Sequence, residues 1–316
     1  MADYRDPRAV FEETLYQLGV ENPRILAVSC DSAKGAGLGK FTAAFPARSV
    51  EVGIAEQSAV GICAGLALRG FIPVVAAITP FITMRCYEQL RDDVGYVNGN
   101  VKIVGSGAGL AYSTLGSTHE AIEDIAVMKS IPNMMILNPG DAFEIDAVLR
   151  AAISHHGPVY IRMPRQKCPD LVPPDRRICR LGKAEYLRSG SDAAILTSGT
   201  MGTEALAAAK LLEQEGIHTA VVNFPVLRPI DKIAVQKAAV RARLLVTLEE
   251  HSVSGGMGST VAEILASMQD LHAPLLKMGI PEGAKATGSY EALLSCYRLT
   301  GAAVAETIKT TLRASL

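Results

Sequence analysis

Short apolar runs alternate with amphipathic segments along almost the whole chain, and this alternation restricts the fold more than any other feature. Runs such as residues 25–29 and 135–137 are uniformly apolar, as expected for strands buried on both faces. Segments between the runs, such as residues 8–18, carry apolar residues at helical spacing. Buried strands separated by helices are typical of a parallel sheet with helices on both faces, so the sequence predicts an α/β fold.

A proline-rich segment divides this pattern into two parts. Residues 164–174 contain four prolines with charges between them, which is typical of a linker. The pattern then restarts, and a length of 316 residues suits two domains of ordinary size. We therefore expect two parallel-sheet α/β domains, at 1–175 and 190–316. Expected strands are 25–29, 71–78, 101–105, 135–137, 159–161, 193–197, 220–223 and 244–248; expected helices are 8–18, 56–68, 87–96, 121–128, 142–154, 204–215, 233–239 and 259–268.

Composition and charge exclude several classes of protein. Apolar residues make up 49% of the chain and charged residues 20%, which indicates a packed globular protein rather than a disordered one. The 31 basic and 32 acidic residues leave a net charge of −1, so no basic excess points to nucleic acid as a partner. No stretch of about 20 residues is apolar without a charge, so we expect no membrane span. Six scattered cysteines without a CxxC pair, and a charged N-terminus, favour buried reduced thiols and a cytoplasmic location.

Glu56 is the first candidate functional residue. It follows a strand-like run and begins a helix of small apolar residues, beside Ile54, Val60 and Ile62. A carboxylate in an apolar pocket is suited to sharing a proton with a ligand nitrogen. From the local pattern alone, a Glu that only caps the helix is the commoner interpretation.

Residues 79–89 form the second candidate segment, at a strand-to-helix loop. Phe81 and Arg85 offer a ring and a cation that suit the stacking of a flat heterocycle, although ordinary loop packing is the alternative.

The third and fourth segments contain a histidine and two arginines. Ser117 and Glu120 fit a capping box, which would place His119 in the first turn of a helix, close to a ligand oxygen or in a purely structural role. Arg162 and Arg165 follow a strand, where a guanidinium can bind a phosphate or carboxylate, or simply face water.

Taken in order, these segments resemble the C-terminal portion of the transketolase family over nearly the whole chain. The matching pieces are EVGIAEQ, TPFITMRCYEQ, GSGAGLAYSTLGSTHEAIEDIA, NPGD, IRMPRQ, SGTMGTEALAAAKLL, FPVLRPID and TLEEHSVSGGMGS. The resemblance implies a pyrimidine-binding domain followed by the transketolase C-terminal domain, thiamine diphosphate as cofactor, and transfer of a two-carbon ketol unit between sugar phosphates or related sugars.

The resemblance also implies roles for individual residues. Glu56 matches the glutamate that contacts the aminopyrimidine, Phe81 matches an aromatic of the pyrimidine pocket, and Arg85 lies near the cofactor in the related deoxyxylulose-phosphate synthase. His119 matches a catalytic, substrate-contacting residue and Arg165 the arginine that holds a sugar phosphate. Asp31 matches an acidic residue at the entrance of the active site.

Three positions depart from the family pattern. Leu115 stands where a hydroxyl-reading Asp is usual, Gly35 where a phosphate-binding Ser is usual, with Lys34 beside it as a substitute, and Ile78 replaces a second pocket aromatic. A leucine cannot accept a hydrogen bond, so a substrate hydroxyl beside it would lose about 1–3 kcal/mol. These departures put the usual pentose-phosphate specificity in doubt.

The chain lacks the GDG motif by which the family holds the diphosphate and its metal; the nearest string is Gly140-Asp141-Ala142. The resemblance thus implies half of an active site, with no metal ligand in this chain. We expect an N-terminal partner subunit that carries the GDG motif and Mg²⁺ or Ca²⁺, in an α₂β₂ assembly. The alternatives are a 2-oxo acid-using relative, like the synthase or a dehydrogenase β subunit, and a non-catalytic assembly paralogue.

Overall fold

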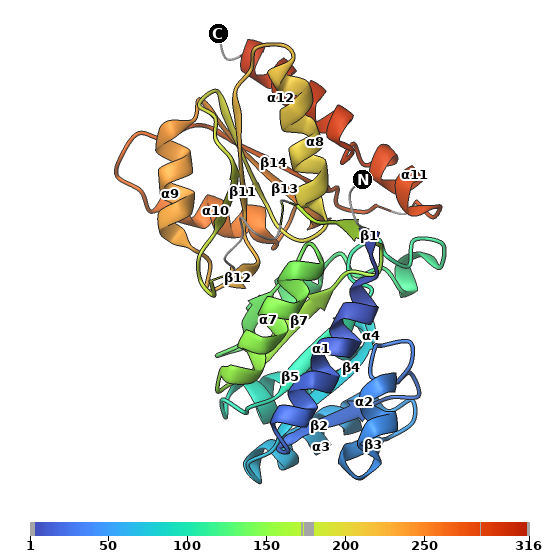
Figure 1. Cartoon of the computed structure of the whole chain (residues 1–316). Helices are drawn as coiled ribbons and strands as arrows, with labels where there is room; N and C mark the ends of the chain where they lie inside the picture. The colour runs from blue at the N-terminus through green and yellow to red at the C-terminus, as the bar shows by residue number, and fades with distance from the viewer. Residues whose placement is uncertain (1–3, 172, 174–179, 285, 315–316) are drawn as a thin grey trace.

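The chain forms two mostly parallel sheets, each with helices on both faces (Figure 1). The computed structural model describes residues 4–171, 173, 180–284 and 286–314. The α/β prediction is confirmed, with antiparallel strands only at sheet edges and in a short two-stranded ribbon.

The first sheet has seven strands in the order β12-β6-β7-β5-β4-β2-β3. Helices α1, α2 and α7 cover one face with an apolar core, and α3, α4 and α6 cover the other. The strands are β2 (Ile25–Ser29), β3 (Ser49–Glu51), β4 (Ile72–Ile78), β5 (Lys102–Ser106), β6 (Met135–Leu137), β7 (Val159–Met163) and β12 (Val226–Arg228). The helices are α1 (Pro7–Glu21), α2 (Gly39–Ala44), α3 (Glu56–Leu68), α4 (Thr79–Thr83), α5 (Tyr87–Gln89), α6 (Asp124–Lys129) and α7 (Ala142–Ser154), with short turns η1 (Pro46–Arg48), η2 (Leu90–Gly95) and η3 (Gly116–Thr118).

The second sheet has five strands in the order β14-β13-β10-β11-β9. Helices α8, α11 and α12 pack on one face, while α9 and α10 pack on the other. The strands are β9 (Glu185–Arg188), β10 (Ala193–Thr197), β11 (Thr219–Asn223), β13 (Leu244–Ser252) and β14 (Leu275–Ile280). The helices are α8 (Met201–Glu213), α9 (Lys232–Arg241), α10 (Met257–Ala266), α11 (Tyr290–Cys296) and α12 (Gly301–Ala314).

The two halves share structure across the linker. Strand β12 comes from the second half of the chain, yet it pairs antiparallel with β6 of the first sheet. One apolar core also runs from α3 and α6 into α9 and α10. The linker itself contributes β8 (Cys168–Pro169), which pairs antiparallel with β1 (Tyr4–Arg5) near the N-terminus. Pro174 and Cys179 lie outside the described residues.

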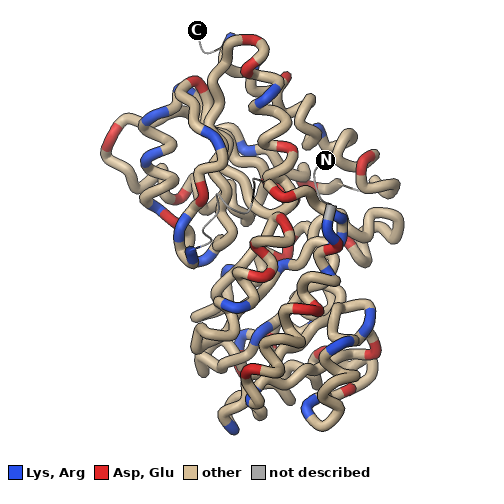
Figure 2. The backbone as a smooth tube through the Cα atoms, viewed as in Figure 1, with Lys and Arg blue, Asp and Glu red and all other residues tan. Residues whose placement is uncertain are grey.

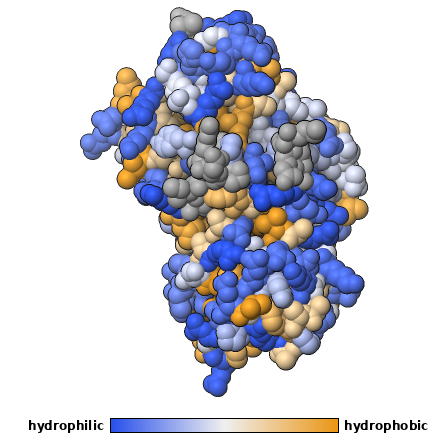
Figure 3. Space-filling model, viewed as in Figure 1, coloured by the Kyte–Doolittle hydropathy of each residue, from blue (hydrophilic) through white to orange (hydrophobic). Residues whose placement is uncertain are grey.

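Surface and chain properties agree with a mixed-charge globular protein. Basic and acidic residues are interspersed along both halves (Figure 2), and the face drawn in Figure 3 is mainly hydrophilic with small hydrophobic groups. Every helix in the described ranges falls short of the length and hydrophobicity needed to cross a bilayer. The described cysteines are free thiols; Cys296 is exposed rather than buried as expected, and the others are buried.

Candidate active site

Glu56 is a buried carboxylate at the start of α3. Its side chain is 4% exposed, and its Oε2 accepts a hydrogen bond from Nη1 of Arg85 at 2.7 Å. The N-terminus of α3 has no side-chain capping bond, so the geometry does not support the interpretation of Glu56 as only a cap. Of the expected apolar neighbours Val60 is buried, but Ile54, in the loop before α3, and Ile62, on the helix, are exposed.

Arg85 connects Glu56 to an aromatic ring. Its guanidinium carbon lies 4.4 Å from the centroid of the Phe81 ring, so the planar cation donates to a carboxylate and also stacks on a ring. Two buried thiols flank this group: burial, with the charge of Glu56 adding to it, raises the pKa of Cys30 to about 11 and of Cys86 to about 12. Glu56 therefore faces polar partners in otherwise apolar surroundings.

Phe81 continues the row of side chains toward His119. The two rings meet edge to face, with centroids 5.3 Å apart, and Nδ1 of His119 lies 2.8 Å from the hydroxyl of Thr118. His119 also lies beside Tyr112, with centroids 6.0 Å apart. The Arg165 guanidinium carbon lies 4.5 Å from the centroid of the Tyr112 ring. The structure thus brings together a carboxylate, an imidazole and a guanidinium, in a continuous row of contacts: Glu56, Arg85, Phe81, His119, Tyr112 and Arg165.

The row lies where parallel strands end. Phe81 and Arg85 follow β4, Tyr112 and His119 follow β5, and Arg165 follows β7. The carboxyl ends of parallel strands form one edge of a sheet, which is the usual ligand edge of such folds. Ile78, the half-buried last residue of β4, lies at the same edge immediately before α4.

The capping box predicted for Ser117 and Glu120 is wrong. Ala121 pairs with Gly109 in an antiparallel bridge, so its backbone is extended and the helix begins only at Asp124. Ser117 lies instead in the short η3 turn. Glu120 is buried, and burial together with nearby Glu123 raises the pKa of its carboxyl.

Asp31 lies close to the Glu56 pocket, next to buried Cys30. Its backbone adopts a left-handed conformation with φ 55°, and its amide donates to Oε1 of Glu51 at 2.7 Å. Glu51 also accepts from the Ser29 hydroxyl and from the amide of Gly53, which joins the ends of β2 and β3. Burial works against the charge on Glu51, but these bonds outweigh it and lower the pKa of its carboxyl.

Among the described residues, Lys34 and Gly35 have no recorded contact with the row, and Leu115 contacts it only through the backbone of Tyr112. Lys34 and Gly35 are exposed, and a Cβ added at Gly35 would meet only a backbone oxygen at 3.5 Å, so nothing steric requires glycine there. Leu115 is 55% exposed, and its amide donates to the carbonyl of Tyr112 at 2.8 Å.

Tyr112 is the site residue that the sequence did not suggest. The available signal was an aromatic inside a glycine-rich segment that follows a buried strand. Nothing in that local pattern specifies that its ring lies between His119 and Arg165.

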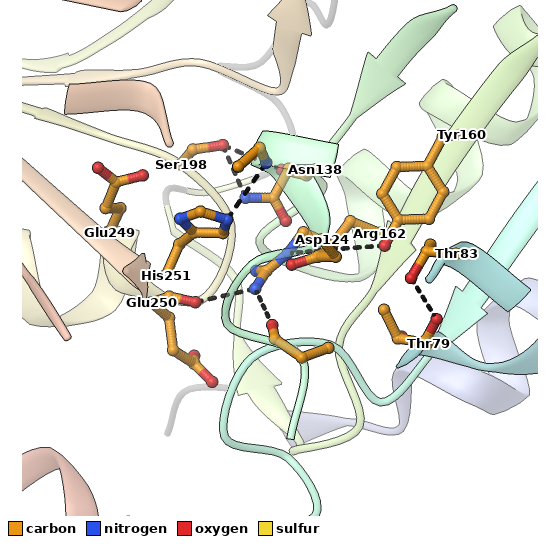
Figure 4. Close-up of polar contacts among 12 residues, drawn as sticks. Thr79, Thr83, Asp124, Asn138, Tyr160, Arg162, Ser198, Glu249, Glu250 and His251 are labelled. Carbon is orange, nitrogen blue, oxygen red and sulfur yellow. Dashed lines mark hydrogen bonds and ion pairs between the residues drawn. The ribbon is translucent and has the colours of Figure 1, made fainter. Parts of the chain in front are cut away.

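Arg162 differs from Arg165, although both lay in one candidate segment. Arg162 is 4% exposed and its Nε donates to Oδ2 of Asp124 at 2.9 Å (Figure 4). Burial disfavours its charge, but the carboxylates of Asp124 and Glu250 and the hydroxyl of Tyr160 outweigh burial and raise the pKa of Arg162. Its guanidinium also donates to the carbonyls of Ala121 and Glu250, across the two halves of the chain. Arg162 is therefore a structural residue, which leaves Arg165 as the arginine facing solvent.

Comparison with known proteins identifies the two halves. The pyrimidine-binding domain of transketolase matches residues 4–170, and the transketolase C-terminal domain matches residues 182–304. The chain is 36% identical over 300 residues to one subunit of the apulose-4-phosphate transketolase of Phocaeicola vulgatus, and the match covers 95% of each protein.

Two further comparisons extend this result. A solved split-gene transketolase, described as an inactive β4 tetramer, is 37% identical with a TM-score of 0.87, and the match covers 98% of this chain and 99% of that one. The 1-deoxy-D-xylulose-5-phosphate synthase of Heliobacterium modesticaldum is 38% identical over 297 residues, but this chain spans only 45% of its length. With family models covering most of its length and relatives matched from end to end, this chain belongs to the transketolase family and consists of that family's pyrimidine-binding and C-terminal domains.

Proposed function

We propose that this chain is the C-terminal subunit of a split, thiamine diphosphate-dependent transketolase, which transfers a two-carbon ketol unit between sugar phosphates or related sugars. The row from Glu56 to Arg165 carries the proposal, because it sets a buried carboxylate, a ring, an imidazole and a free guanidinium along one sheet edge. End-to-end similarity to a single subunit of the apulose-4-phosphate transketolase supports the split arrangement.

The side chains present fit the pyrimidine half of the cofactor. Oε2 of Glu56 accepts an N–H from a planar cation, and that cation lies on the face of Phe81. An aminopyrimidine is likewise a planar group with N–H donors, so the same carboxylate and ring would hold it, with Ile78 adding apolar contact. When bound, the cofactor supplies the nucleophilic carbon that carries the two-carbon unit.

The chain's own residues then have separate roles. Glu56, whose side chain is 4% exposed, would hold a proton at a ring nitrogen of the cofactor. His119 donates to or accepts from substrate oxygens, and Arg165 binds a terminal anion of the substrate. Asp31 and the exposed Lys34, Gly35 and Leu115 would line the approach to this row.

An exposed apolar face beside Glu56 supports the need for a partner. Ile54 is 76% exposed and Leu68 79% exposed, and both flank the outer face of α3. Gly61 and Gly65 lie between them, with no atom within 4 Å of an added Cβ. We propose that an N-terminal subunit covers this face, bringing the diphosphate-binding GDG motif and its Mg²⁺ or Ca²⁺, in an α₂β₂ complex.

The test is reconstitution with a GDG-bearing subunit in the presence of thiamine diphosphate and Mg²⁺. Ketol transfer is expected only in the mixture, and Glu56→Gln in this chain should abolish it. Glu282→Gln is the matched control, since Glu282 is an exposed carboxylate far along the chain. If the Glu56→Gln complex kept its turnover, the chain would be an assembly subunit without a catalytic role.

A 2-oxo acid-using activity is the second candidate, because synthases of that kind are 38% identical to this chain. It is distinguished by the release of carbon dioxide from a 2-oxo acid donor in the same mixture. Ketose consumption without carbon dioxide supports the transketolase assignment.

A further inference from the structure

Arg165 is an exposed cation whose guanidinium lies over an aromatic ring. Within the described part of the chain it has no carboxylate and no hydrogen-bond partner, and its one recorded contact is with the Tyr112 ring at 4.5 Å. An arginine free in water loses substantial side-chain entropy when it binds an anion. A ring that already orders the guanidinium reduces that loss.

Tyr112 is itself fixed by a glycine. A Cβ added at Gly107 would lie 2.2 Å from Cε2 of Tyr112, so the ring occupies the space that any other residue at 107 would need. Gly107 adopts φ 72°, a conformation that glycine reaches without strain. The ring therefore packs directly against the backbone.

The backbone at Gly107 also fixes the position of the segment that carries Arg165. The amides of Gly107 and Ala108 both donate to the carbonyl of Met163 at 3.1 Å, and Met163 lies two residues before Arg165. These hydrogen bonds thus join the loop that carries Tyr112 to the segment that carries Arg165. The opposite neighbour of the ring is His119, so Tyr112 lies between the imidazole and the guanidinium.

We propose that Tyr112 is a positioning residue, which holds the Arg165 guanidinium ready to bind the terminal tetrahedral oxyanion of the substrate. The ring acts and the hydroxyl does not, because the hydroxyl of Tyr112 has no hydrogen-bond partner among the described residues. The inference rests on the proposed function for its substrate, but the contact itself is a property of this chain.

Kinetics of the reconstituted enzyme test the role. In Tyr112→Leu, KM for a phosphorylated aldose acceptor should rise about two- to fivefold, the range expected for loss of an exposed cation–π contact, with kcat unchanged. KM for the same aldose without phosphate should not change. Tyr112→Phe should behave as wild type. Tyr16→Leu is the matched control, because it removes a tyrosine ring on α1 that contacts Lys40 of α2.

A second measurement separates this inference from the proposed function. The Nε–Hε resonance of Arg165, assigned with Arg165→Lys, should show a ring-current shift in wild type and Tyr112→Phe and lose it in Tyr112→Leu. Inorganic phosphate, titrated and followed at that resonance, should bind more weakly to Tyr112→Leu than to wild type or Tyr112→Phe. Equal phosphate binding by wild type and Tyr112→Leu, or equal rises in KM for both aldoses, would overturn the positioning role. Absence of ketol transfer by the wild-type mixture would overturn the proposed function, while the phosphate titration would still decide the role of Tyr112.

Discussion

Replacing Arg162 by methionine should strongly destabilise the protein. Arg162 and Asp124 form a buried ion pair, in which Oδ2 of Asp124 also accepts the Tyr160 hydroxyl at 2.6 Å. Oδ1 of Asp124 is buried and has no partner among the described residues, so the carboxylate depends on these two bonds. Methionine would fill much of the volume of the arginine but leave Asp124 as an uncompensated charge.

The expected loss of stability follows from the buried groups that Arg162→Met would leave without a partner. Breaking a buried pair by removing one partner costs about 3–5 kcal/mol. The carbonyls of Ala121 and Glu250 also lose their donor, which adds to the loss. Against a typical stability of about 5–15 kcal/mol, Arg162→Met should lower the free energy of unfolding by at least about 3 kcal/mol.

A double-mutant cycle in urea checks the mechanism. Asp124→Asn removes the charge, so Arg162→Met/Asp124→Asn should be more stable than the sum of the single losses predicts, by about 2 kcal/mol. Arg165→Met, an exposed arginine on the same segment, should change stability by less than about 0.5 kcal/mol. A loss below about 1 kcal/mol for Arg162→Met, or strict additivity in the cycle, would refute the ion-pair argument.

Two further predictions concern a buried carboxylate and a glycine. Burial raises the pKa of Glu249 to about 7 although the amides of Met257 and Gly258 donate to it, so the folded chain binds an extra proton between about pH 4.5 and 7. Glu249 should therefore lower stability by about 3 kcal/mol as pH rises through that window. The fall between pH 5 and pH 8 should be smaller in Glu249→Gln by about that amount, and parallel curves for the two proteins would contradict it. Gly107→Ala should cost about 1–2 kcal/mol through its positive φ and should displace Tyr112, raising KM for a phosphorylated acceptor; an unchanged KM would show that the ring does not move.

Much of the fold was predictable because strand and helix patterns are local. The strands at 25–29, 135–137 and 193–197 and the helices at 56–68 and 142–154 match residue for residue. The predicted helix at 87–96 is instead a short α-helix followed by the π-helical turn η2, a difference that apolar spacing does not report.

Features that depend on distant contacts were not predictable. The late start of α6 follows from the pairing of Ala121 with Gly109. The ion pair of Arg162 with Asp124 joins a strand to a helix 38 residues away. The candidate site shows the same difference. Short sequence motifs were enough to predict five of its residues: Glu56, Phe81, Arg85, His119 and Arg165. The place of Tyr112 depends on how two loops meet.

The strand exchanged between the halves has a consequence for synthesis of the chain. Leu137 on β6 pairs with Val226 on β12, which the ribosome makes about 90 residues later. At roughly 5–20 residues per second, the nascent first half waits about 5–20 s with one edge of its sheet unpaired. An open edge of that kind can pair with other chains, so this interval is when the growing protein most needs a chaperone to keep neighbouring nascent chains away.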